Sequence, residues 1–257
     1  MVTPAWGVPA ERYEEEYLKV VEHLGITDLG SPILTHIEPG ARVLDLGCAT
    51  GRQARLMRDR GCTVVGVERD PDAAQQAGAW CERVIVCDLD VADLVAEVGS
   101  DRFDVIAAGD ILEHLRDPAQ LLRSSLGLLR PGGRVVASVP NVAHGSVRLA
   151  LLTGTFSYEE TGILDRTHLR FFTLESISAL FESAGLEVVH VGRTEVPIDG
   201  ATPYDRSRLP RGVEKAVARM PEATTFGFVI VAVPTGTGVS PTSASTPRSS
   251  RFRRSAR

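Results

Sequence analysis

The stretch Val43-Leu-Asp-Leu-Gly-Cys-Ala-Thr-Gly51 decides the fold expected for this chain. It begins as a short apolar run, typical of a buried strand, and passes directly into a turn that carries Gly47 and Gly51. Residues without a Cβ atom adopt positive φ angles readily and let a ligand approach the backbone closely. A segment of helical length follows, and the free N–H groups of a helix N-terminus would face the same place. The stretch therefore predicts a strand, a ligand-binding turn and a helix.

Outward from this stretch, short β-branched runs alternate with segments of helical length. The expected strands are residues 42–46, 63–68, 83–87, 103–108, 134–139, 187–191 and 226–233. The expected helices between them are residues 51–60, 71–79, 91–98, 118–129 and 174–184. This alternation is typical of a parallel sheet that is covered by helices on both faces. No run reaches the roughly 20 apolar residues of a membrane-spanning helix, so no span is predicted.

Three parts of the chain are expected. Residues 1–40 form an N-terminal helical segment that packs on the core, with an amphipathic helix over residues 11–24. Residues 41–234 form the main domain, and residues 141–173 interrupt its rhythm as a lid on the substrate side. Residues 235–257 form a disordered basic tail, because their Ser, Thr, Gly, Pro and Arg cannot bury enough apolar surface.

Composition excludes several classes of protein. The chain has 257 residues, of which 43% are hydrophobic and 24% charged, which is unlike a disordered, collagen-like or coiled-coil chain. Its four cysteines form no C-x-x-C pair and lie in apolar stretches, so reduced thiols in a cytoplasmic protein are expected. Residues 1–234 carry 23 basic and 33 acidic side chains, a net charge of −10, which argues against a nucleic-acid partner. The oligomeric state is left open.

Carboxylates follow the second and third expected strands. Glu68 lies twenty-one residues after Gly47, where an acidic side chain accepts hydrogen bonds from the ribose hydroxyls of a nucleoside. Asp88 and its neighbour Leu89 follow the third strand and are placed to meet an adenine ring. The dinucleotide pattern G-x-G-x-x-G is incomplete, because Ala49 stands at its second glycine and the third is also absent. A nucleoside ligand other than NAD is therefore expected.

Together these residues resemble the class I S-adenosylmethionine-dependent methyltransferases. The resemblance extends over 41–233 and includes Phe103-Asp-Val-Ile-Ala-Ala-Gly-Asp-Ile-Leu-Glu-His-Leu115 and Leu128-Leu-Arg-Pro-Gly-Gly-Arg-Val-Val136. It implies a Rossmann-like, doubly wound α/β fold with a seven-stranded, mostly parallel sheet, an antiparallel last strand and a small lid insertion. It also implies S-adenosylmethionine as cofactor. The cofactor-binding residues it implies are Asp45, Gly47, Cys48, Gly51, Glu68, Arg69, Asp88, Leu89 and Gly109. The sequence departs from the family pattern at Ala49, where a second glycine is usual.

Methyl transfer to a hydroxyl requires a held acceptor and a group that takes its proton. Histidine is the side chain most often used near neutral pH. His168 lies in the polar and aromatic string 165–173, and His144 follows the fifth strand, so either is a candidate base. Asp165 and Arg170 are expected to orient the acceptor.

Residues 147–173 also resemble a bacterial methyltransferase subgroup often associated with glycan and glycosyltransferase pathways. This resemblance implies O-methylation of a sugar or glycan hydroxyl. Methylation of a small aromatic or secondary metabolite is the alternative enzymatic function. A cofactor-binding partner protein without turnover is the further alternative.

Two interpretations of Asp110, Glu113 and His114 are open. On a helix the three side chains would share one face and could bind a divalent cation, as a similar string does in some ubiquinone-pathway O-methyltransferases. Asp110 as helix N-cap with Glu113 three residues later would instead form a capping box, which accounts for both acids without a metal. The sequence favours the capping box, and no metal is expected.

Overall fold

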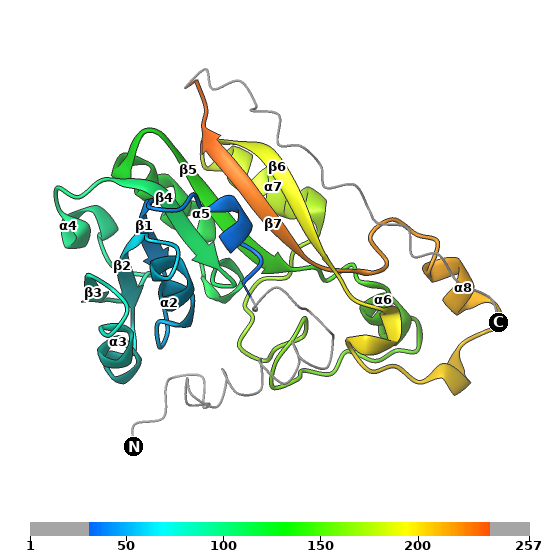
Figure 1. Cartoon of the computed structure of the whole chain (residues 1–257). Helices are drawn as coiled ribbons and strands as arrows, with labels where there is room; N and C mark the ends of the chain where they lie inside the picture. Colours follow the sequence, from blue (N-terminus) through cyan, green and yellow to red (C-terminus); the bar gives the residue numbers. More distant parts are fainter. Residues whose placement is uncertain (1–30, 237–257) are drawn as a thin grey trace, which may run out of the picture.

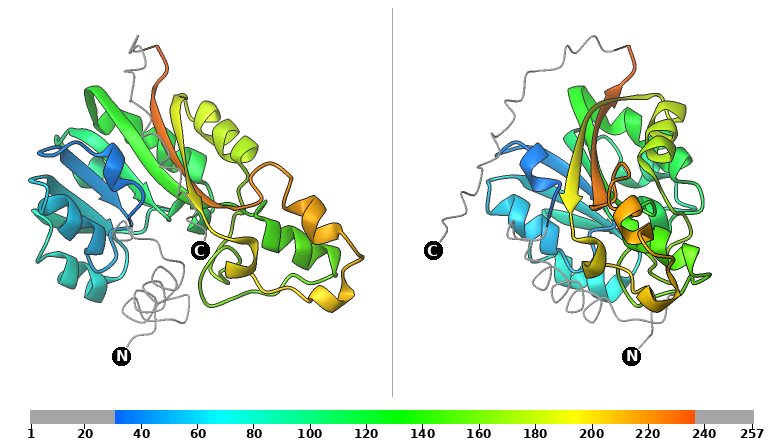
Figure 2. Two further views of the ribbon diagram at one scale, coloured as in Figure 1. Left: turned by 45° about the vertical axis from the view of Figure 1, so that its right-hand side comes forward. Right: turned by 90° about the vertical axis from the view of Figure 1, so that its right-hand side faces the viewer.

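The computed structural model describes residues 31–236, whose elements are shown in Figures 1 and 2. The strands are β1 (Arg42–Leu46), β2 (Thr63–Glu68), β3 (Arg83–Val86), β4 (Phe103–Gly109), β5 (Leu129–Pro140), β6 (Leu186–Glu195) and β7 (Thr225–Pro234). The α-helices are α2 (Arg52–Arg58), α3 (Pro71–Ala77), α4 (Leu94–Val98), α5 (Pro118–Ser125), α6 (Gly145–Leu152), α7 (Leu174–Ser183) and α8 (Val213–Val217). The short 3-10 turns are η1 (Leu34–His36), η2 (Leu112–His114), η3 (Leu126–Leu128), η4 (Ile198–Gly200) and η5 (Arg206–Arg208).

The strands form one seven-stranded sheet in the order β3-β2-β1-β4-β5-β7-β6. Strands β1 to β5 pair in parallel, whereas β7 is antiparallel to both β5 and β6. The predicted doubly wound sheet with an antiparallel last strand is confirmed. The strand order reverses between β1 and β4, and ligands of open α/β sheets bind beyond the carboxyl ends of the strands at such a point.

Alternating residues of β1 supply the cores on both faces of the sheet. Val43 packs with Ala54 and Met57 of α2, and Leu44 packs on the other face with residues of α4, α5 and α7. Side chains of successive strand residues point to opposite faces, so a strand buried on both faces must be apolar almost throughout. Figure 1 shows α2 and α3 beside β1 to β3, and α5 and α7 behind the sheet. This two-sided burial accounts for the apolar runs in the sequence.

Strand β5 begins earlier than predicted. The sequence predicts a helix to residue 129, but α5 ends at Ser125 and η3 follows it. Leu129 already pairs with Phe103 of β4, and a register shift lies between Phe103 and Val105. Pro131, Gly132 and Gly133 therefore lie in an irregular strand start and not in a separate loop.

The segment predicted as a lid, residues 141–173, packs with a second segment, the chain between β6 and β7. We call the two segments together the lid. Helix α6 lies within the predicted lid, and the chain between β6 and β7 adds η4, η5 and α8, for which no element was predicted. Helix α6 contacts both η4 and α8, and Figure 2 shows this assembly at the carboxyl ends of β5 and β6. Val147, Ile163 and Leu164 form a small core of their own there. The lid is thus a packed unit whose two halves come from distant parts of the sequence.

The structure does not describe residues 1–30 and 237–257, so the predicted helix at 11–24 and nearly all of the predicted basic tail lie outside the described residues. Thr235 belongs to the described part, and its backbone N–H donates to the Gly185 carbonyl at 3.0 Å. No helix within residues 31–236 has the length and apolar character needed to cross a membrane.

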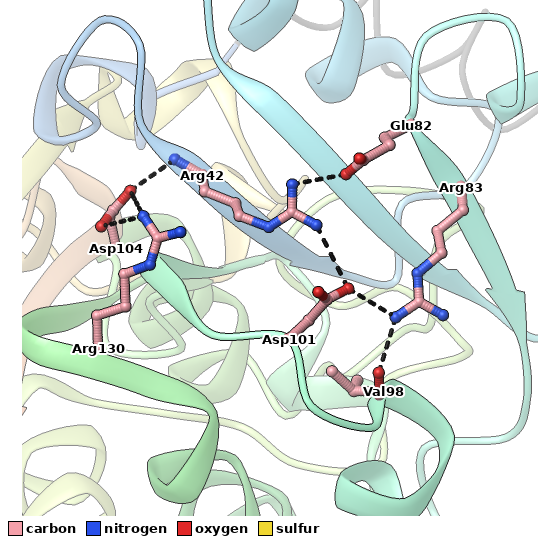
Figure 3. A network of polar contacts seen from close by, with 7 residues as sticks. All are labelled: Arg42, Glu82, Arg83, Val98, Asp101, Asp104 and Arg130. Atoms are coloured by element: carbon pink, nitrogen blue, oxygen red, sulfur yellow. Dashed lines mark hydrogen bonds and ion pairs between the residues drawn. The ribbon is translucent and has the colours of Figure 1, made fainter.

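A network of charged side chains joins the amino-terminal ends of β1, β3 and β4 (Figure 3). The Arg42 guanidinium lies 2.6 Å from Glu82 and 3.3 Å from Asp101, which also lies 3.0 Å from the Arg83 guanidinium. Asp104 accepts the backbone N–H of Arg42 at 2.8 Å and binds Arg130 through both carboxylate oxygens at 2.9 Å. This network lies at the edge of the sheet opposite the glycine turn, so its role is structural.

We expect Asp104→Ala to lower the free energy of unfolding by about 1–3 kcal/mol, because it leaves a partly buried backbone N–H without its acceptor. Asp101→Ala removes side-chain ion pairs alone and should cost less than about 1 kcal/mol. Urea unfolding of the two variants beside the parent chain measures both values. Equal losses would contradict the role given to the Arg42 backbone contact.

Candidate functional site

The turn after β1 has the left-handed backbone that its glycines permit. Gly47 has a φ of 75° and Gly51 a φ of 87°, values that side chains with a Cβ atom rarely adopt. The backbone N–H groups of Gly47 and Cys48 donate to the Val67 carbonyl of β2 at 2.8 and 3.0 Å. Ala49, which departs from the family pattern, also has a positive φ of 46°. The methyl group of Ala49 therefore does not prevent a left-handed backbone at this position of the turn.

The Glu68 carboxylate fixes this turn to the end of β2. Its Oε2 accepts the backbone N–H of Ala49 at 3.0 Å, and its Oε1 accepts those of Arg69 and Asp70 at 2.7 and 2.8 Å. An ionised carboxylate has about four acceptor positions, so it retains capacity for a further donor such as a ribose hydroxyl. Glu68 therefore lies at the end of β2 beside the glycine turn, and its predicted contact with a ribose stays a prediction.

Asp45 lies in β1, two residues before Gly47, and one of its carboxylate oxygens lacks a hydrogen-bond donor among the described residues. Its side chain is buried, and within residues 31–236 its Oδ2 has no hydrogen-bond partner. Burial, and then the nearby charge of Glu68, raise the pKa of Asp45 to about 7. A buried acceptor without a partner is costly in a folded protein and fits a site completed by a ligand donor.

The end of β3 supplies the outer part of the site. The Asp88 carboxylate lies 3.7 Å from the Arg69 guanidinium and also accepts the backbone N–H of Asp90 at 3.0 Å. Leu89 is half-buried and packs against the core. The ends of β1, β2 and β3 thus present the predicted residues along one edge of the sheet.

The turn after β4 lies against the turn after β1. Ile111 Cδ1 is 2.8 Å from the place where a Cβ on Gly47 would lie. Gly109 is closely covered, because a Cβ there would lie 2.3 Å from Gln53 Nε2. The β1 and β4 turns therefore pack against each other at the reversal of strand order.

The predicted capping box at Asp110 is wrong. Asp110 has a φ of 51°, and the three-residue turn η2 follows it in place of an α-helix. Ile111 holds the N-cap position of η2, with no side-chain cap. Because Glu113 is not drawn into capping, its carboxylate is available for another role.

Glu113, His114 and His168 converge. One ligand atom from each lies within 4.8 Å of the others, and the two imidazole rings meet edge to face with centroids 4.8 Å apart. Glu113 is buried, and its Oε2 has no hydrogen-bond partner among the described residues. Asp110, the third member of the metal set considered from the sequence, is not part of this cluster. His168, which lies 54 residues after His114, takes that place.

Hydrogen bonds hold both imidazoles. His168 Nδ1 lies 3.1 Å from the Ile163 carbonyl, which can only accept, so Nδ1 carries the proton and Nε2 the lone pair. His114 Nδ1 lies 3.3 Å from the Thr167 carbonyl and 3.1 Å from Thr167 Oγ1. Thr167 Oγ1 donates in turn to Asp165 Oδ1 at 2.6 Å. Asp165 therefore positions His114 through Thr167.

Burial disfavours the charged forms of the three side chains in this cluster. It lowers the pKa of His114 to about 4, with a smaller contribution from His168, and it also lowers the pKa of His168. Burial, followed by the Asp110 charge, raises the pKa of Glu113 well above its usual range. Without a bound cation, burial therefore favours the neutral form of each of the three groups.

His144 does not fit the predicted role of base. It is fully buried at the N-cap of α6, where its Nδ1 lies 2.8 Å from Ser146 Oγ and its Nε2 lies 3.1 Å from the Val196 carbonyl. Both ring nitrogens are engaged inside the fold, so His144 joins the two halves of the lid.

Arg170 is exposed, and its guanidinium donates to the Arg116 carbonyl. Its backbone N–H and that of Leu169 both donate to the Glu113 carbonyl, at 2.9 and 2.8 Å. The backbone of Leu169 and Arg170 therefore fixes the lid to η2. The Arg170 side chain binds the Arg116 carbonyl and not the histidine cluster.

A family profile described as a methyltransferase domain matches residues 12–191. The chain belongs to the S-adenosylmethionine-dependent methyltransferases. It is 31% identical over 166 residues to a ubiquinone biosynthesis O-methyltransferase of Pseudomonas fluorescens, covering 62% of this chain and 70% of that one. It is 30% identical to the enzyme of that name from Aeromonas salmonicida, covering 58% of this chain and 64% of that one.

Solved structures share the methyltransferase fold. A methyltransferase of Thermotoga maritima superposes with a TM-score of 0.58 at 17% identity, covering 85% of this chain and 93% of that one. The 1,6-didemethyltoxoflavin-N1-methyltransferase of Burkholderia thailandensis, solved with S-adenosylhomocysteine, superposes with a TM-score of 0.51 at 21% identity, covering 91% and 93%. S-adenosylmethionine is the cofactor of this methyltransferase family.

We expect Asp45→Asn to gain stability relative to the parent chain as the pH rises. The native state holds the Asp45 proton up to a pKa of about 7, whereas the unfolded chain releases it near pH 4, so this contribution is lost as the pH rises between these values. The variant minus parent difference in free energy of unfolding should increase by about 2–3 kcal/mol between pH 5 and pH 8. Urea unfolding at both pH values measures it, and a constant difference would contradict the raised pKa.

Proposed function

We propose that the methyltransferase binds S-adenosylmethionine across the β1 and β4 turns and transfers its methyl group to a hydroxyl acceptor beside His168. In this proposal the backbone of the turn at Gly47, Cys48 and Gly51 lies along the cofactor, and Asp45 accepts from its amino group. The remaining cofactor-binding residues are Glu68 for the ribose hydroxyls, Arg69, Asp88 and Leu89 for the adenine, and Gly109 at the β4 turn. The unmet acceptor of Asp45 supports this fit.

The cofactor supplies an electrophilic methyl carbon on a sulfonium sulfur. The cluster of Glu113, His114 and His168 is the observation that supports a hydroxyl acceptor. Ile111 packs against the β1 turn, and Glu113 follows it by two residues, so the cluster lies beside the proposed cofactor site. His168 Nε2 has the lone pair needed to take the acceptor proton. Burial raises the pKa of Glu113 and so favours its protonated form, which is able to donate a hydrogen bond to the acceptor oxygen.

A phenolic hydroxyl suits this site better than a sugar hydroxyl. Burial makes His168 a weaker base than free histidine, so it is matched to a more acidic acceptor. A phenol has a pKa of about 10, well below that of an aliphatic alcohol. The names of the relatives as ubiquinone biosynthesis O-methyltransferases point in the same direction. The sugar or glycan hydroxyl implied by the sequence resemblance is the second acceptor class.

The same three residues fit a divalent cation. Two imidazole nitrogens and an unpartnered carboxylate oxygen form a mixed donor set, and a cation there would favour ionised Glu113. The chemistry such a cation supplies is a lowered pKa of the acceptor hydroxyl. His168 would then serve as a ligand, and its removal would affect activity through metal affinity.

The cofactor assignment predicts that Glu68→Ala raises the dissociation constant for S-adenosylmethionine at least about tenfold, because the ribose loses its acceptor and the Ala49 backbone its anchor. Isothermal titration calorimetry of the purified chain measures this constant. Glu82→Ala is the matched control, since Glu82 lies at the opposite end of the sheet and should leave binding unchanged. Unchanged binding by the Glu68 variant would refute its role.

The base assignment predicts that His168→Ala lowers kcat by roughly 10²–10⁴-fold while cofactor binding is retained. His190→Ala serves as control, because His190 is exposed and stacks on His36 away from the cluster. Activity that is unchanged after dialysis against EDTA supports the base, whereas activity that is lost and restored by Mg²⁺ assigns His168 as a ligand. Full activity of the His168 variant would overturn both roles.

The acceptor is tested with methyl-labelled S-adenosylmethionine and two probes, a catechol and a methyl glycoside. Label in the catechol supports the phenolic acceptor, and label in the glycoside alone replaces it with the sugar hydroxyl. Cofactor binding with no transfer to either probe, or to any fraction of a cell extract, would favour the non-catalytic partner protein.

A further inference from the structure

Two cysteines that are distant in the sequence meet beneath the cofactor turn. Cys48 belongs to the turn after β1, and Cys81 lies between α3 and β3. Both approach Gly66 in the middle of β2. A Cβ at that position would lie 2.6 Å from Cys48 Sγ and 3.2 Å from Cys81 Sγ. The absence of a side chain at residue 66 therefore creates the space in which the two sulfur atoms lie together.

The two thiols differ in access and in acidity. Cys48 is buried, whereas Cys81 is partly exposed. The interaction between the two neighbouring thiols lowers the pKa of Cys81 and raises that of Cys48. The charges of Asp45 and Glu68 further oppose a thiolate at Cys48. The more accessible sulfur is therefore also the one that ionises first, as expected for an attacking thiol beside a resolving one.

We propose that Cys48 and Cys81 form a redox modification site at which a disulfide of low molecular weight closes an intramolecular bond that weakens cofactor binding. Because the second part of this statement depends on the turn being the cofactor site, it rests on the proposed function.

The reaction is a thiol–disulfide exchange in two steps. The Cys81 thiolate attacks one sulfur of the external disulfide, forms a mixed disulfide and releases one thiolate. Cys48 Sγ then attacks Cys81 Sγ, its proton passes to the departing sulfur, and a second small thiol leaves. Two protein thiols are oxidised by two electrons, and one external disulfide is reduced to two thiols.

The bond acts on the turn because Cys48 is part of it. A disulfide requires a sulfur–sulfur distance of about 2.05 Å, which is shorter than any non-bonded contact between two thiols. Cys48 donates its backbone N–H to Val67 and accepts that of Gly51 at 2.9 Å, so movement of Cys48 displaces the turn between Gly47 and Gly51. Small displacements of positioning groups reduce binding and rate strongly.

The test uses the full chain, reduced and then treated with glutathione disulfide. We expect the mass to fall by two hydrogens, two of the four thiols to remain alkylatable, and peptide mapping to join Cys48 to Cys81. The dissociation constant for S-adenosylmethionine should rise about tenfold or more and return to its reduced value with dithiothreitol.

Two variants complete the experiment. Cys81→Ser should bind S-adenosylmethionine like the reduced parent chain and show no response to glutathione disulfide. Cys62→Ser should retain the full response, because Cys62 donates to the Glu38 carbonyl at the other end of β2.

A glutathione adduct that stays on Cys81, or a disulfide between other cysteines, would overturn the site. A Cys48–Cys81 bond that leaves cofactor affinity unchanged would overturn its effect. Failure of the reduced chain to bind S-adenosylmethionine would instead overturn the proposed function, and peptide mapping would still decide whether the disulfide forms.

Discussion

Parallel pairing of β1 with both β2 and β4 is the constraint on which the site depends. It places the carboxyl ends of three strands at one edge, so the Gly47 turn, the Glu68 carboxylate and the turn at Ile111 meet there. The backbone bonds from Ala49 to Glu68 and from Gly47 to Val67 then fix the turn to the neighbouring strand. The opposite edge carries the ion network of Figure 3, which joins the amino-terminal ends of β1, β3 and β4.

A second contact brings the lid to this edge. The Glu113 carbonyl accepts two backbone N–H groups, from Leu169 and Arg170, and thereby fixes the segment that carries His168 against η2. His144 joins the lid from within by bridging α6 to Val196. The lid is therefore a positioned part of the site, and the location of His168 depends on backbone hydrogen bonds as much as on its own side chain.

The site holds buried acids at a cost in stability. Asp45 and Glu113 both have raised pKa values because burial disfavours their charged forms, and each has an oxygen without a partner within the described chain. Such groups cluster where a ligand completes the hydrogen bonding. The Cys48 and Cys81 thiols lie beside the same turn, so the turn that we propose as the cofactor site is also the place where the proposed oxidation would act.

The sequence by itself determined the strands, the glycine turn and the carboxylates that follow the strands, because these features depend on residues close together in the chain. The alternation of short apolar runs with segments of helical length was sufficient for the doubly wound sheet, and the spacing from Gly47 to Glu68 placed these two residues at one end of it. Tertiary structure alone decided which histidine completes the cluster, since His114 and His168 meet through the fold of the lid. It also assigned His144 to capping, released Glu113 from the expected capping box and brought Cys48 beside Cys81. The physical reason is that a local pattern determines backbone conformation and burial, whereas contacts between distant segments depend on how the lid and strands pack.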